Sequence, residues 1–247
     1  MREERTGARI LKNLLYAGLV IAVAAVGFII LMNTAFVIRT IDVEGCTYSD
    51  ADLIAREVQT DEYSENSLML FLQLKTGKQP QIDFVDEVQV SFISPWHICL
   101  NVTEKTLYGV MYDADTQQYT YFDSAGTVVE ISETSVSDIL ELNGTTSGDA
   151  VAGESLKLLP KGSISYVTEV FGLIGEYELD VYSVYVDSDG MISFDTSGIT
   201  ISLGSDENTA EKFSNLVLIL DQLDGMSGTL DLSAFEEAGD DIIFTQE

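Results

Sequence analysis

Residues 14–32 read LLYAGLVIAVAAVGFIILM and contain nothing more polar than Tyr16. No charged residue occurs between Lys12 and Arg39. An α-helix rises about 1.5 Å per residue, so roughly 20 apolar residues cross a hydrocarbon core of about 30 Å. A helix also satisfies its own backbone hydrogen bonds, which lipid cannot do. The sequence therefore predicts a transmembrane helix over residues 14–35.

A cleaved signal peptide is the alternative interpretation of this run. The apolar region of a signal peptide spans about 7–15 residues and ends in a small-x-small cleavage site. The run in this chain is longer, and residues 28–31 are the bulky sequence FIIL. The pattern favours an anchor that stays on the protein.

Charge is distributed unevenly on the two sides of this run. The chain has 12 Lys and Arg against 41 Asp and Glu, a net charge of −29. Residues 1–13 hold four basic and two acidic residues, a net charge of +2, which leaves −31 for the rest. Basic flanks stay in the cytoplasm. We therefore expect a single-pass protein of the cell membrane, with residues 1–13 as a cytoplasmic tail and the acidic remainder outside the cytoplasm.

The acidic balance also excludes some classes of partner. Nucleic-acid binding needs clustered Lys and Arg that neutralise phosphates, and a polybasic grip on anionic lipid needs the same residues. The chain has one His and two Cys, too few for a disulfide framework or a four-cysteine zinc site. We expect no nucleic acid among its partners.

Residues 36–105 predict a small α+β domain. Residues 36–45, FVIRTIDVEG, alternate as a strand does, and Gly45 ends them. Ser49, three residues before Asp52, resembles a capping box that opens a helix, and residues 67–74 predict a second helix before Pro80. Residues 88–92 and 96–102 alternate on either side of Ser94-Pro95, which predicts a hairpin.

Residues 106–247 predict a strand-rich domain with two helices, so the fold class is α+β. Apolar spacing predicts helices around residues 164–174 and over 209–223, and a polar loop over 143–153. Alternating runs between turn residues predict strands over 107–112, 118–122, 128–131, 181–186, 191–194, 199–203, 229–232 and 242–244.

The order of these segments resembles the FtsQ/DivIB family of bacterial cell-division proteins. The family has a short basic tail, one membrane helix, a POTRA domain and a C-terminal β domain. Its strand I-x-V-x-G matches residues 41–45, and V-x-V-x-x-x-x-P begins at Val88. The V-x-E strand end matches residues 102–104, and the D-x-x-G-x-V hairpin matches residues 123–128. Residues 199–204, ITISLG, and 228–232, GTLDL, are similar to the closing strands, and residues 139–144, ILELNG, match L-P-x-L-x-G except for its proline.

The resemblance implies a POTRA-like β-α-α-β-β domain over 36–105 and a C-terminal β domain over 106–247. It also implies a non-enzymatic scaffold at the division septum. Such a scaffold binds FtsL and DivIC/FtsB outside the membrane and so connects to the FtsW and FtsI-type peptidoglycan synthases. The partner adds a strand to an open sheet edge.

On this chain the predicted edge is formed by the last two strands. The expected apolar contacts are Leu230, Leu232, Phe235, Ile242 and Phe244. The same alternation arises when such residues belong to the core, and the sequence leaves both interpretations open.

Other candidate sites have weaker support in the sequence. His97 and Cys99 lie two residues apart on one predicted strand, about 6–7 Å along it, which is beyond hydrogen-bond reach for a nucleophilic pair. Cys46 and Cys99 form a disulfide only if they meet in the fold, which leaves their pairing open. The segment Asp187-Ser188-Asp189-Gly190 resembles part of a calcium loop but lacks the further ligands, so a hairpin turn is favoured.

From these residues we expect no catalytic site, no metal site and no cofactor. Two other classes of protein remain as alternatives. One is a different anchored POTRA protein that assists polypeptide transport or assembly, which usually carries several POTRA modules. The other is an anchored cell-wall enzyme, which needs a convergent catalytic group.

Overall fold

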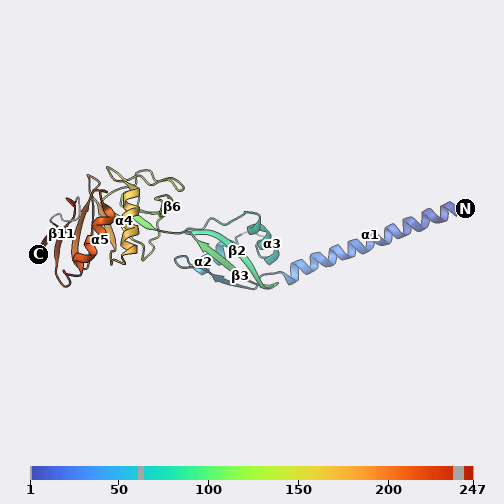
Figure 1. Ribbon diagram of the computed structural model, residues 1–247. Coiled ribbons are helices and arrows are strands. Elements are labelled where there is room, and N and C mark those ends of the chain that lie inside the picture. The colour runs from blue at the N-terminus through green and yellow to red at the C-terminus, as the bar shows by residue number, and fades with distance from the viewer. Residues whose placement is uncertain (1, 61–63, 236–241, 247) are drawn as a thin grey trace. The chain divides into compact units, whose positions relative to one another are not determined.

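The computed structural model describes residues 2–60, 64–235 and 242–246, which form a mixed α+β protein (Figure 1). The chain divides into two compact units, residues 1–104 and 105–247, which we call unit 1 and unit 2. The division follows Glu104, one residue before the boundary expected from the sequence. The predicted α+β class is confirmed at this level.

Unit 1 begins with helix α1, Arg2–Ala35. Within it, Asn13–Ala35 is long and apolar enough to cross a membrane, and its large apolar side chains are exposed rather than packed against protein. The helix is continuous through residues expected to form a separate tail. The prediction of one N-terminal apolar helix is confirmed.

The rest of unit 1 is a three-stranded sheet with two helices. Its elements are β1 (Thr40–Glu44), α2 (Ala51–Val58), α3 (Ser67–Lys75), β2 (Val85–Ser94) and β3 (His97–Glu104). The sheet order is β1-β3-β2, with β1 parallel and β2 antiparallel to the central β3. Helix residues Ile54 and Leu70 pack against the sheet residues Val88, Ile98 and Leu100, and all five are at most 2% exposed.

The first cap of this unit differs from the sequence prediction. Asp50, not Ser49, caps α2, and its carboxylate accepts the Asp52 amide at 2.8 Å. The Ser49 amide instead donates to the Glu104 carboxylate at 2.8 Å. Ser49, the cap predicted from the local sequence, is therefore bonded instead to Glu104, which is 55 residues away in the chain.

Unit 2 is built on a nine-stranded sheet with the order β12-β11-β10-β9-β8-β7-β4-β5-β6. Its first strands are β4 (Gly109–Asp113), β5 (Gln118–Phe122), β6 (Val128–Ser132) and β7 (Glu141–Asn143). The others are β8 (Ser183–Val186), β9 (Ile192–Thr196), β10 (Ile199–Gly204), β11 (Gly228–Asp231) and β12 (Ile243–Gln246).

Strand β7 was not anticipated. It pairs in parallel with β4 on one side and β8 on the other, so it joins the strands β4–β6 to the strands β8–β12. Leu142 at its centre is 1% exposed and belongs to the core. The predicted loop over 143–153 begins inside this strand, because three residues are too short a run for periodicity to show.

Two helices, α4 (Ile164–Glu176) and α5 (Thr209–Leu220), pack on this sheet. The ring of Phe213 in α5 stacks on Phe194 of β9 at 5.9 Å and on Tyr177 at the end of α4 at 6.2 Å. Phe171 of α4 meets Phe122 of β5 at 5.8 Å. These aromatic contacts join both helices to the sheet in one continuous core.

Candidate functional site

An unpaired strand edge is the feature that the sequence analysis linked to partner binding. A sheet edge presents backbone N–H and C=O groups that another chain is able to pair with. Among the residues that the structure describes, the two sheets have four such edges, formed by β1, β2, β6 and β12. The candidate site is the edge that the described residues obstruct least.

Two of the four edges are covered locally. At β2, the Gln79 side-chain amide accepts the Val88 N–H at 3.0 Å and donates to the Val88 carbonyl at 3.3 Å, as a neighbouring strand would. At β6, Val128 exchanges hydrogen bonds with Glu154 and Gly153 at 2.9 and 2.8 Å, and Lys105 donates to Val129. These bonds occupy backbone groups that an added strand needs.

The β1 edge carries charge instead. Asp42 and Glu44 are exposed on this five-residue strand, and the Asp42 carboxylate lies 2.8 Å from Nε2 of His97. A short strand with carboxylates is a common way of blunting an edge.

The β12 edge has neither kind of obstruction in the part of the chain that the structure describes. There β12 pairs with β11 alone, antiparallel, in the register Asp231↔Ile243 to Gly228↔Gln246. Ile243 is 61% exposed, and Thr245 and Gln246 are also exposed. The described face of β12 is therefore suited to accept a further strand.

The close approach of β11 to β12 depends on a glycine. A Cβ at Gly228 would lie 2.2 Å from the Thr245 carbonyl oxygen and 3.0 Å from the Gln246 Cα. No side chain fits in that space, so glycine is required for β12 to hold its place on the sheet.

The structure divides the five predicted contact residues into two groups. Leu230 and Leu232 are each 1% exposed and Phe235 is 5% exposed, so all three are core residues whose side chains are not available to a partner in this fold. Ile242 and Phe244 are half-buried and pack against the same core. The five residues predicted as partner contacts therefore lie on the core-facing side of the last strands. Alternation of apolar and polar residues along a strand does not show which of its two faces is covered.

The exposed apolar residue of this edge, Ile243, was missed. It lies between Ile242 and Phe244, so its side chain points to the opposite face of the strand. In the strand register Ile243 stands opposite the polar Asp231, which indicates that both side chains are on the outer face. That register comes from the fold, so the sequence alone contains no usable signal for Ile243.

The cysteines are free thiols in unit 1 and are not arranged for nucleophilic chemistry. Burial raises the pKa of the Cys99 thiol, and the Glu44 and Asp42 carboxylates raise it further. Burial, with Glu104 and Asp50, likewise raises the pKa of Cys46. Both shifts disfavour the thiolate, which is the reactive form.

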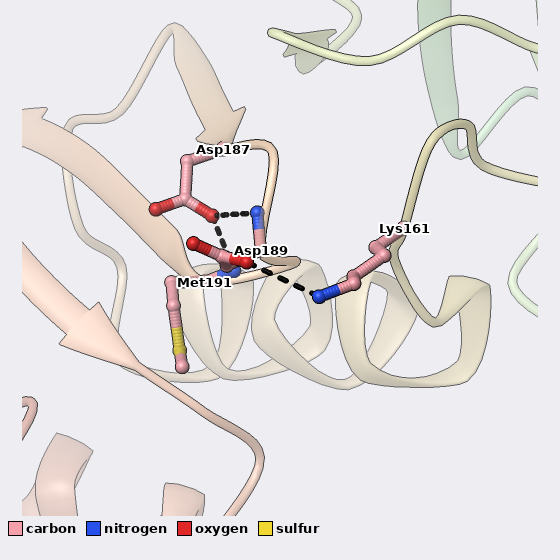
Figure 2. Close-up of polar contacts among 4 residues, drawn as sticks. All are labelled: Lys161, Asp187, Asp189 and Met191. Carbon is pink, nitrogen blue, oxygen red and sulfur yellow. Dashed lines mark hydrogen bonds and ion pairs between the residues drawn. The ribbon is translucent and has the colours of Figure 1, made fainter.

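The segment from Asp187 to Gly190 forms the turn between β8 and β9 (Figure 2). The Asp187 carboxylate accepts the amides of Asp189 and Met191 at 2.8 and 2.9 Å, and Lys161 lies 3.1 Å from the Asp189 carboxylate. The Asp187 carboxylate therefore stabilises the turn, and the Asp189 carboxylate forms an ion pair with Lys161. Over residues 2–60, 64–235 and 242–246, no group of three or more His, Cys, Asp or Glu side chains is placed to hold a metal.

No family model matches this chain, and a comparison with curated proteins gives no match.

Proposed function

We propose that this protein is a non-enzymatic, membrane-anchored scaffold of the bacterial cell-division machinery, similar to FtsQ/DivIB. The observation that carries the proposal is the open β12 edge, which ends a nine-stranded sheet in a chain that begins with a membrane-length apolar helix. In this proposal α1 is the anchor, and both folded units lie outside the cytoplasm at the septum.

The arrangement of unit 1 supports the comparison with a POTRA domain. Its order is strand, helix, helix, strand, strand, and its last strand lies between the other two. One such module follows the anchor directly. This arrangement favours a division scaffold over transport proteins, which usually carry several POTRA modules.

The proposed partners are FtsL and a DivIC/FtsB-like protein, and through them the FtsW and FtsI-type synthases. A partner segment would add as a strand to β12, where backbone hydrogen bonds supply affinity and alternate side chains supply specificity. Ile243 would provide the apolar contact. The chain outside the anchor is strongly acidic, so basic residues on the partner would strengthen the encounter.

A charge at Ile243 tests this site. The full chain carrying Ile243→Glu is expected to bind the DivIC/FtsB-type ectodomain of the same cell at least about tenfold more weakly, a change of about 1.4 kcal/mol. Binding is measured by titration calorimetry. Because Ile243 is exposed, the thermal midpoint should stay at the wild-type value.

The matched control is Tyr182→Glu, which places the same charge at a residue that is 80% exposed and precedes β8, four strands from β12. It should bind as the wild type does. Full binding by Ile243→Glu, or by a chain that lacks residues 242–247, would show that β12 is not the site.

A further inference from the structure

Unit 1 exposes a group of large apolar side chains around the turn between β2 and β3. Phe92, Ile93 and Trp96 on this turn are 43, 58 and 45% exposed. Met69 at the start of α3 and Val37 are 42 and 38% exposed. We call these five residues the tip patch.

Three of the five residues, Phe92, Ile93 and Trp96, belong to an uncharged stretch of an otherwise acidic chain. No Asp, Glu, Lys or Arg occurs from residue 88 to residue 103, which includes the whole turn. The ring of Phe92 is held against Phe71 at 5.5 Å, so the patch is a formed surface. Water is a poor environment for such a group of side chains.

Hydrogen bonds tie the turn to the end of α1. The Ser67 amide donates to the Phe36 carbonyl at 2.9 Å, and the Ser67 hydroxyl donates to the Pro95 carbonyl. The Trp96 carbonyl accepts the Arg39 amide at 2.9 Å. Phe36 directly follows Ala35, the last residue of the membrane-length segment. Two hydrogen bonds through Ser67 therefore connect the β2–β3 turn to the first residue after that segment.

A second contact adds to this connection. The Asn66 side-chain amide donates to the Met32 carbonyl at 2.8 Å, within the last turns of α1. A groove of about 520 Å³ opens beside it. Its apolar side is lined by Phe28, Ile29 and Met32 of α1 and by Val37 and Met69 of the tip patch, and its polar side by Asn33, Glu65 and Asn66. The apolar surface of α1 thus continues into the tip patch.

We propose that the tip patch docks into the extracytoplasmic interface of the membrane that α1 spans. The headgroup layer extends only about 5–7 Å beyond the hydrocarbon on each side. A turn tied to residues 36–39 falls within that layer when α1 crosses the bilayer. The patch would orient unit 1 on the membrane surface, and lipid would cover the apolar side of the groove.

The side chains suit this environment. Trp and other amphipathic rings favour the boundary between hydrocarbon and headgroups. Arg39 is exposed at the same end of unit 1, where its guanidinium would meet lipid phosphate. The carboxylate of Glu65 is also exposed there and would remain in the headgroup water. The acidic ectodomain would not adsorb by charge, so the contact is confined to the tip patch.

Trp96 reports on this contact directly, because it is the only tryptophan in the chain. The full-length protein is reconstituted in vesicles of phosphatidylethanolamine and phosphatidylglycerol, with bromine on the acyl chains either near the headgroup or near the terminal methyl. Near-headgroup bromine is expected to quench Trp96 by roughly half, and terminal bromine less, because interfacial rings sit at headgroup depth. Lipid should also shield Trp96 from aqueous acrylamide.

A charged variant and a matched control complete the experiment. Ile93→Glu is expected to lower the ratio of docked to undocked protein roughly tenfold, since burial of this side chain is replaced by burial of a carboxylate. Bromine quenching should fall accordingly. Leu53→Glu alters an apolar residue that is 47% exposed, against 58% for Ile93, in the first turn of α2 at the Glu104 end of unit 1, and should leave quenching unchanged.

The wild-type measurement alone is sufficient to overturn the proposal. If brominated lipid does not quench Trp96 and acrylamide quenches it as fully as a free tryptophan amide, the tip patch is not in lipid. The vesicles contain no other protein, so this outcome would be independent of the binding of β12 to a partner.

Discussion

Glu104, the last residue of β3, holds the loop that connects β1 to α2. Its carboxylate accepts the amides of Thr47 and Ser49 at 2.8 Å each and that of Tyr48 at 3.2 Å. Three successive amides around one carboxylate form an anion-binding nest. The same loop contains Gly45, where a Cβ would lie 2.2 Å from the Val102 carbonyl oxygen, so it follows β3 closely.

The ionisation of Glu104 is coupled to this loop. Burial alone raises the pKa of the carboxyl, but the hydrogen bonds from Ser49, Thr47 and Tyr48 outweigh burial and hold the pKa below its ordinary value of 4.5. A group with a lowered pKa in the fold binds fewer protons when folded than when unfolded. Its stabilisation is therefore present above the ordinary pKa and is lost as pH falls through the folded pKa.

Glu104→Gln should destabilise unit 1 near neutral pH by about 1–2 kcal/mol, because a neutral amide replaces a charge-assisted acceptor that is partly exposed. The gap between variant and wild type should narrow as pH falls below the ordinary pKa of 4.5 and close only below the lowered folded pKa, where the wild-type carboxyl is protonated in both states. Urea unfolding across this pH range provides the measurement.

Glu87→Gln is the control, since it changes an exposed carboxylate on β2 of the same unit. It should have little effect at any pH. A pH-independent difference between Glu104→Gln and wild type would mean that the loop does not depend on the charge.

A second buried polar cluster lies in unit 2 and is formed by side chains from two helices. Lys212 of α5 is fully buried and donates to the Leu203 and Ser205 carbonyls at 2.9 and 3.1 Å. The Tyr166 hydroxyl of α4 donates to the Ser205 carbonyl at 2.8 Å. Burial lowers the pKa of Lys212, against the opposing effect of Glu207 and Asp206, and burial raises that of Tyr166. The cluster satisfies the carbonyls where β10 ends.

Strand β12 depends on its pairing with β11. It is four residues long, it has one strand neighbour among the described residues, and it fits against β11 only because residue 228 is glycine. A short edge strand with one neighbour is among the less stable parts of a sheet.

Gly228→Ala should therefore displace β12. The added Cβ meets backbone atoms of Thr245 and Gln246, which cannot move aside as a side chain does. We expect a loss of about 1–3 kcal/mol in the free energy of unfolding. Amide exchange in residues 243–246 should rise by more than that of β9 or β10, and hydrogen-exchange mass spectrometry measures both.

Gly175→Ala provides the comparison. Gly175 lies in α4 with nothing near its Cβ position, so alanine should leave stability unchanged or raise it by up to about 1 kcal/mol. Unchanged protection of β12 in Gly228→Ala would contradict the close packing of β11 and β12.

The two units have separate cores. The buried cluster of unit 1 includes Val88 and Leu100, that of unit 2 includes Leu142 and Phe213, and the two clusters share no residue. A domain with its own core is able to fold independently of its neighbour.

Calorimetry of residues 36–247 should therefore show two unfolding transitions. Val88→Ala, in the core of unit 1, should lower the midpoint of one transition, and Leu142→Ala, in the core of unit 2, should lower the midpoint of the other. The expected loss of unfolding free energy is about 2–4 kcal/mol for the leucine and somewhat less for the valine. If either substitution shifted both transitions together, the units would form one cooperative body.

Much of this architecture was predictable because most elements carry a local signal. Strand β5, Gln118–Phe122, was predicted with its exact bounds, and α3 was predicted to within one residue. Both are long enough for their apolar period to show, and turn residues or Pro80 limit them. Strand β7 has only three residues, and its identity comes from its neighbours β4 and β8, which are distant in sequence.

The candidate site was less predictable. The sequence located the last two strands, but it selected Leu230, Leu232 and Phe235, which face the core, and missed Ile243. Which face of an edge strand is covered depends on helices and strands elsewhere in the fold. The exposed tip patch was not anticipated either, because a strand period gives no information about exposure at a hairpin turn.

The order of amino acids alone established the apolar N-terminal helix, the uneven distribution of charge and the α+β class. These properties follow from composition and from periods of a few residues, which are local. The folded chain established the order of the strands, the side chains that are buried, the hydrogen bonds or charges that obstruct three of the four described sheet edges, and the bonds that tie the β2–β3 turn to the end of α1. These properties depend on contacts between residues far apart in sequence, such as Glu104 with Ser49 and Pro95 with Ser67. Only packing brings such residues together, and packing is a property of the whole chain.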